Sequence, residues 1–163
     1  MKRESGFTLI ELLLVLAIIG IISAIAIPAL LGQRARARDK ASMSNLDGII
    51  ADGIGQWDKY REQGASPTTA MNSVASYIKK GHTKDVNPWN GTSPAYGSMT
   101  VAAGNAATVS AFLTGTLAAG SLGQVKLYGQ PSTSTLPGFM GGMVLLHGTT
   151  NGSLNYRKAA AVE

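Results

Sequence analysis

The stretch GFTLIELLLVLAIIG, residues 6–20, contains a single charged side chain, the carboxylate of Glu11. The chain then continues without any charge through residues 12–31. At about 1.5 Å per residue, a helix of that length spans the hydrocarbon core of a bilayer. A helix buried inside a soluble protein seldom stays apolar on every face for so long. The sequence therefore predicts a membrane-spanning helix with one carboxylate near its start.

A cleavable secretory signal is the alternative for this apolar run. Such a signal has an apolar region of about 7–15 residues that ends at a cleavage site of small residues. Residues 23–26, SAIA, resemble such a site weakly. The helical pattern, however, continues well past them, which favours the membrane-spanning helix.

Basic residues flank the run on both sides. Lys2 and Arg3 precede it, and four cations follow it closely: Arg34, Arg36, Arg38 and Lys40. A count of Lys and Arg alone would place the segment after the run in the cytoplasm. The two-residue spacing spreads the later cations around a helix, so a solvated or headgroup-facing collar is favoured over a face that binds nucleic acid. Nucleic acid is therefore not indicated as a partner, although the net charge is +5.

The helix is predicted to continue beyond the apolar run, through residues 33–64, and to end near Gly64. Apolar residues recur there at three- and four-residue steps on one face. They are Met43, Leu46, Ile50, Trp57 and Tyr60, with Gly53 between them. The glycines Gly48, Gly53 and Gly55 are interpreted as points of close packing rather than as a hinge.

Residues 65–163 are predicted to form an α+β head. Ser66 and Pro67 are typical of a helix start, and Gly81 of a helix end. The loop VNPWNGTSPAYG, residues 86–97, offers Trp89 and Tyr96 as anchors. Strands are expected at residues 99–103, 108–113, 124–128, 143–147 and 153–158, with a connector at 130–142 and a hairpin loop at 148–152. An antiparallel sheet laid across the second half of the long helix is the expected packing.

Residue types that carry enzymatic chemistry are scarce. The chain has no cysteine and two histidines, and neither histidine has neighbours at metal-ligand spacing. Nucleophile-elbow, phosphate-loop and zinc-protease motifs are missing. We therefore expect neither an enzyme nor a cofactor or metal. Asn90 and Asn151 match the N-x-S/T pattern, but both are interpreted first as Asn-Gly turns.

The N-terminal sequence MKRESG followed by FTLIELLLVLAIIGIISAIAIP resembles the leader and assembly helix of the type IV pilin and pseudopilin family. The resemblance implies a leader at residues 1–6 and a transmembrane and assembly helix at residues 7–32. A prepilin peptidase would cut between Gly6 and Phe7, and the new amine of Phe7 would be methylated. Glu11, the fifth residue from Phe7, would serve subunit assembly. Gly20 and Pro28 mark a predicted kink.

The same resemblance implies a structural subunit of a filament that serves adhesion, motility or DNA uptake. Its partners would be further copies of itself in a helical homopolymer, the prepilin peptidase, and the assembly machinery of the inner membrane. The precursor would cross the inner membrane once, with its leader in the cytoplasm and its head exported to an extracellular pilus. This orientation opposes the Lys and Arg count, which does not reliably orient a chain whose large domain is exported.

Two alternatives remain. A pseudopilin of a type II-like secretion system, in a periplasmic pseudopilus, is favoured by the Pro-Trp loop at residues 86–97. It is disfavoured because residues 86–162 contain no Asp or Glu, and calcium, which major pseudopilins bind there, prefers carboxylate oxygens. The second alternative is a single-pass membrane protein whose head binds a ligand. It would keep its leader and stay monomeric in the membrane.

Overall fold

A computed structural model describes residues 6–92, 94–101, 121–133, 137–147 and 156–162, together with Phe112, Gly115 and Leu117. The chain divides into two compact units, Met1–Ala37 and Arg38–Glu163. The first helix, α1 (Leu9–Glu62), contributes to both of them. Each unit is described separately below.

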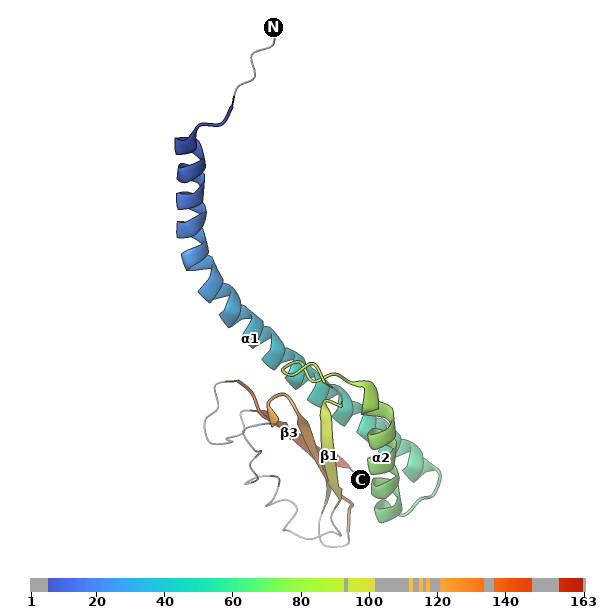
Figure 1. Cartoon of the computed structure of the whole chain (residues 1–163). Coiled ribbons are helices and arrows are strands. Elements are labelled where there is room, and N and C mark those ends of the chain that lie inside the picture. Colours follow the sequence, from blue (N-terminus) through green and yellow to red (C-terminus); the bar gives the residue numbers. More distant parts are fainter. Residues whose placement is uncertain are drawn as a thin grey trace. The chain divides into compact units, whose positions relative to one another are not determined.

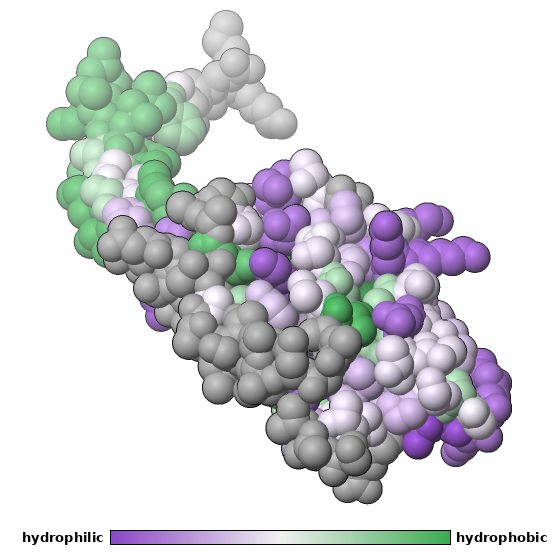
Figure 2. Space-filling view, turned by 90° about the horizontal axis from the view of Figure 1, so that it is seen from below, coloured by the Kyte–Doolittle hydropathy of each residue, from purple (hydrophilic) through white to green (hydrophobic). Residues whose placement is uncertain are grey.

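The first unit contains the apolar part of α1, and its side chains are exposed. Phe7 is 87% exposed and Ile25 is 74% exposed, although both are strongly apolar. Figure 2 shows this segment as a green, hydrophobic surface. Among the described residues, α1 is the one helix long and apolar enough to cross a membrane. This surface is therefore available to lipid or to another protein chain.

The second unit is built on the remainder of α1, which buries one face in the head. The buried residues of this part are Ser42, Leu46, Ile49, Ile50, Gly53 and Trp57. Met43 and Tyr60 pack against the same core and are half-buried. The apolar face predicted from the sequence is thus confirmed. The helix ends at Glu62, close to the predicted Gly64.

A second helix, α2 (Pro67–Gly81), lies against the same core. Ser66 caps it, because its hydroxyl accepts a hydrogen bond from the Thr69 amide at 3.2 Å, and Pro67 occupies the first turn. Its apolar face is fully buried and consists of Ala70, Met71, Val74 and Ile78. The short 3-10 helix η1 (His82–Lys84) follows directly.

In the part of the chain that the structure describes, four strands form one sheet in the order β1-β2-β3-β4 (Figure 1). They are β1 (Tyr96–Val101), β2 (Val125–Gln130), β3 (Gly138–Val144) and β4 (Tyr156–Val162). The α+β class is confirmed, but the prediction of a purely antiparallel sheet is wrong for one pair. β1 and β2 are parallel, whereas the other two pairs are antiparallel. A parallel pair needs a long connection, and residues 102–124 supply one.

The predicted strand positions are partly right. Residues 124–128 and 143–147 overlap β2 and β3, and residues 99–103 and 153–158 overlap β1 and β4. The connector expected at residues 130–142 is wrong in its second half, because β3 begins at Gly138. The strand expected at residues 108–113 lies outside the described residues apart from Phe112. The hairpin loop at residues 148–152 lies outside them entirely.

Glycine in β3 explains why the sequence predicted only the end of this strand. Glycine is depleted in strands, so GFMGGMV gives a weak strand signal. Glycine at Gly142 leaves room for two leucines, because a Cβ atom there would lie 2.6 Å from a methyl carbon of Leu127 and would also overlap Leu46, so both would have to shift. The sheet and the second half of α1 therefore approach each other closely at this point.

Polar contacts also tie the sheet to α1. The Tyr156 hydroxyl on β4 donates to Asp47 Oδ1 at 3.0 Å. The Lys158 ammonium lies 3.2 Å from the same oxygen. Asp47 on α1 thus contacts two residues of β4.

Candidate functional site

The first turn of α1 is closed by a reciprocal cap between Thr8 and Glu11. The Thr8 amide and the Thr8 hydroxyl each donate to Glu11 Oε2 at 2.9 Å. The Glu11 amide in turn donates to the Thr8 hydroxyl oxygen at 3.3 Å. This arrangement is a capping box, in which a Thr at the N-cap and a Glu three residues later satisfy free backbone donors. The carboxylate that interrupts the apolar run therefore starts the helix.

Gly6 and Phe7 precede the helix and take no part in it. Both are exposed, and a Cβ atom placed on Gly6 would meet no atom within 4 Å. A peptidase could reach the bond between them without unfolding any regular element. The structure thus brings Gly6, Phe7 and Glu11 together at the start of α1, while their roles in cleavage, methylation and assembly remain predictions.

Gly20 and Pro28 both lie inside α1, which is helical on either side of each. A Cβ atom on Gly20 would meet no atom within 4 Å. Pro28 has no amide hydrogen and cannot bond the carbonyl of Ala24 one turn earlier. The predicted kink at these residues remains a prediction.

Trp89, expected as an anchor of the loop, stacks on the ring of His147 in the second unit. Its ring lies 5.0 Å from that of His147 with an interplanar angle of 8°. The Arg38 guanidinium lies 5.5 Å from the Trp89 ring, and the His147 amide donates to Asp39 Oδ1 at 2.9 Å. The sequence did not predict this group, because its members lie far apart in the chain.

The loop is held from within by Asn87. Its side-chain amide donates to the Leu122 carbonyl at 2.8 Å, and its side-chain oxygen accepts from the Trp89 amide at 2.9 Å. Asn90 accepts from the amide and the hydroxyl of Thr92, which confirms the predicted turn at this Asn-Gly pair. Asn151 lies outside the described residues. Tyr96, the second expected anchor, is buried.

His82 links three segments of the head. Its ring nitrogens contact Asp85 and Asp52, with Nε2 3.2 Å from Asp52 Oδ2. This contact holds the end of α2 on α1. Within the part of the chain that the structure describes, no cluster of His, Asp or Glu could hold a metal ion.

Comparison with known proteins supports the assignment of the N-terminal segment. Residues 1–27 match the family model for the prokaryotic N-terminal methylation motif. The chain carries this motif. The resemblance to type IV pilins and pseudopilins that its N-terminal sequence predicts is thereby confirmed.

Three relatives illustrate the similarity. A fimbrial protein of Neisseria meningitidis serogroup B is 34% identical over 88 residues, covering 54% of this chain and 52% of the relative. A type IV wide pilus major component of Thermus thermophilus is 48% identical over 50 residues, covering 31% of this chain and 38% of the relative. A type II secretion system core protein G of Dickeya chrysanthemi is 26% identical over 79 residues, covering 48% of this chain and 49% of the relative.

These matches span about half or less of each relative's length. No solved structure matches the chain. The similarity thus supports the N-terminal assignment most strongly and leaves the task of the head open.

Proposed function

We propose that this chain is a structural subunit of a bacterial type IV pilus and has no enzymatic activity. One observation carries the proposal: α1 begins inside the matched methylation motif, residues 1–27, and its apolar part exposes its side chains on every face. Such a helix can be covered by lipid in a membrane and by the helices of other subunits in a filament. The same apolar surface thus contacts lipid in the membrane-bound precursor and other subunits in the filament.

The proposed path divides the chain into functional segments. Residues 1–6 form the leader, residues 7–32 the transmembrane and assembly helix, residues 33–64 its continuation, and residues 65–163 the head. The precursor crosses the inner membrane once, a prepilin peptidase cuts between Gly6 and Phe7, and the new amine of Phe7 is methylated. The assembly machinery then moves subunits from the membrane into an extracellular filament.

In this proposal Glu11 sets the register in which neighbouring subunits pack in the filament. In a filament core of packed apolar helices no water is available, so an ionised carboxylate needs a partner. Both Thr8 bonds reach Glu11 Oε2. Oε1 is then the atom that can accept from the Phe7 amine of a neighbouring subunit. A methyl group leaves that amine basic and able to donate.

A secretion pseudopilus is the second candidate. The similarity to the core protein G of a type II secretion system and the Pro-Trp loop at residues 86–97 favour it. The lack of Asp and Glu in residues 86–162 disfavours it, because these residues cannot offer a carboxylate to calcium. A single-pass membrane protein that never polymerises is the remaining alternative.

The experiment that tests the proposal compares cells with and without the gene. Filaments sheared from the cell surface are imaged, and the intact mass of the subunit in them is measured. We expect extracellular filaments whose subunit begins at Phe7 and carries one added methyl group. Periplasmic filaments only would favour the pseudopilin. A protein that still begins at Met1, or is cut near Ala26, would overturn the proposal.

A further inference from the structure

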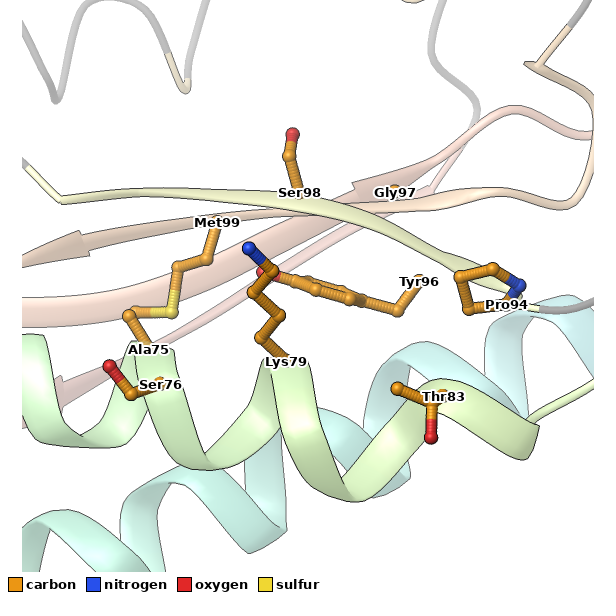
Figure 3. A pocket seen from close by; sticks show the side chains of 9 residues that line it. All are labelled: Ala75, Ser76, Lys79, Thr83, Pro94, Tyr96, Gly97, Ser98 and Met99. Atoms are coloured by element: carbon orange, nitrogen blue, oxygen red, sulfur yellow. The ribbon is translucent and has the colours of Figure 1, made fainter.

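A hollow of about 460 Å³ opens between α2 and β1 in the second unit (Figure 3). Clefts of roughly 300–1,000 Å³ are the usual size for small-molecule sites. Residues of α2, η1 and β1 line it, and Pro94 closes one side. The hollow lies far along the chain from the assembly helix and plays no part in the proposed polymerisation.

A bulge in β1 creates the floor of the hollow. Tyr96 pairs with Val125 and Ser98 with Lys126, so Gly97 is an extra residue without a partner of its own. As a result Tyr96 and Met99, three residues apart, both face the helices, as their contacts with the buried core show. β-Bulges commonly re-aim side chains in this way next to functional sites.

The hydroxyl of Tyr96 has no hydrogen-bond partner among the described residues. The residue is only 6% exposed, and desolvation by burial is the cause that raises the pKa of Tyr96 to about 12. Its phenol therefore stays protonated and remains a donor at neutral pH. Figure 3 shows its ring extending along the hollow. The hydroxyl oxygen is not one of the fully buried side-chain atoms that lack a partner, so it is open to the hollow and can donate to a ligand there.

Lys79 adds a positive charge to the same hollow. It is exposed on α2 and makes no ion pair with any described residue. The hydroxyls of Ser76 and Thr83 donate to the carbonyls of Asn72 and Lys80, so their oxygens still have lone pairs that can accept. Met99 and Pro94 supply apolar surface beside these groups.

We propose that this hollow binds a sugar that carries a carboxylate. The Lys79 ammonium and the Tyr96 hydroxyl are both donors, which suits an anionic oxygen. The Ser76 oxygen suits a hydroxyl of a sugar ring, and Met99 suits its C–H face. Because the one charge at the site, that of Lys79, is exposed, the affinity of a single site is modest, but a filament would display many copies and bind multivalent glycans more tightly.

The test uses the full chain in detergent micelles and follows its backbone amide resonances. The probes are D-galacturonate, its uncharged methyl ester, D-galactose and acetate. We expect galacturonate to shift the amides of residues 75–83 and 96–99 saturably. The methyl ester, galactose and acetate should each bind about tenfold more weakly, because each lacks either the charge or the ring.

Variants locate the binding. Lys79→Met and Tyr96→Phe should each weaken galacturonate binding by about tenfold or more, while their spectra stay those of a folded head. Lys80→Met is the matched control, because it removes an equal charge one residue away and outside this hollow. The proposal is overturned if galacturonate causes no saturable shift, if acetate binds equally well, or if Lys80→Met weakens binding as much as Lys79→Met. The site lies within one subunit, so its failure and the failure of filament assembly are observed separately.

Discussion

Glu11 has two possible tasks at the scale of a single residue. In the subunit its carboxylate closes a capping box with Thr8. In a filament it is proposed to pair with the Phe7 amine of a neighbour. Glutamine can replace glutamate in a capping box, but it carries no charge. The two tasks can therefore be separated by substitution.

We predict that Glu11→Gln keeps the helix start intact and still reduces filaments strongly. Glu11→Leu should reduce them as well and should also lose the cap. The number and length of sheared filaments are compared by microscopy at equal levels of mature protein. Normal filaments from Glu11→Gln cells would show that capping alone explains this residue. Normal filaments from Glu11→Leu cells would reject any role in assembly.

At the scale of the helix, Gly53 shows which glycine is needed for packing. A Cβ atom there would lie 2.5 Å from the Met140 sulfur and 3.1 Å from an Ile78 methyl carbon, and both residues are fully buried. Gly48 and Gly55 are exposed and would meet no atom within 4 Å. The interpretation of all three glycines as points of close packing is therefore right for Gly53 and wrong for the other two.

Alanine substitutions test this difference. Gly53→Ala should destabilise the head by about 1–3 kcal/mol, because Met140 has to move within a packed core. Gly55→Ala should stabilise it by up to about 1 kcal/mol, because alanine is the better helix former and space is open. Urea unfolding of the full chain in detergent measures both changes. Equal effects from the two substitutions would show that helix propensity, and not the contact with Met140, determines the change in the free energy of unfolding.

A second prediction for the helix concerns residues 20–28. Pro28 removes one backbone hydrogen bond, and proline in a helix interior costs about 3 kcal/mol. We expect this segment to lose helix within the assembled filament, which would let subunits slide during assembly. Pro28→Ala should restore helix there in a filament map. A wild-type map with a straight, continuous helix through Ile25 would contradict the prediction.

At the scale of the whole molecule, sequence alone predicted the parts governed by local pattern. The apolar run, the buried face of α1 and the cap at Ser66 follow from residue spacing and were correct. The parallel pairing of β1 with β2 and the glycine-rich first part of β3 were missed. Both depend on contacts between distant residues, which no local pattern records. The lone hydroxyl of Tyr96 was missed for the same reason, since the sequence predicts its burial but not its missing partner.

Two tyrosines of the head, Tyr96 and Tyr156, predict how its stability changes at alkaline pH. Burial raises the pKa of Tyr96 to about 12, and the hydrogen bond to Asp47 is the first cause that raises the pKa of Tyr156. In the unfolded chain both are expected near 10. The folded state therefore holds its protons at a pH where the unfolded state loses them, and stability falls as pH rises from about 10 to about 12.

Urea unfolding of the full chain in detergent should thus give a constant free energy between about pH 7 and 9 and a decline above about pH 10. Tyr96→Phe removes one titrating group and should make the decline shallower. Its stability near neutral pH should be kept or slightly raised, because the lost hydroxyl had no partner among the described residues. Tyr77→Phe, at an exposed position on α2, is the control and should leave the slope unchanged. If Tyr96→Phe declines as steeply as the wild type, Tyr96 does not couple folding to pH.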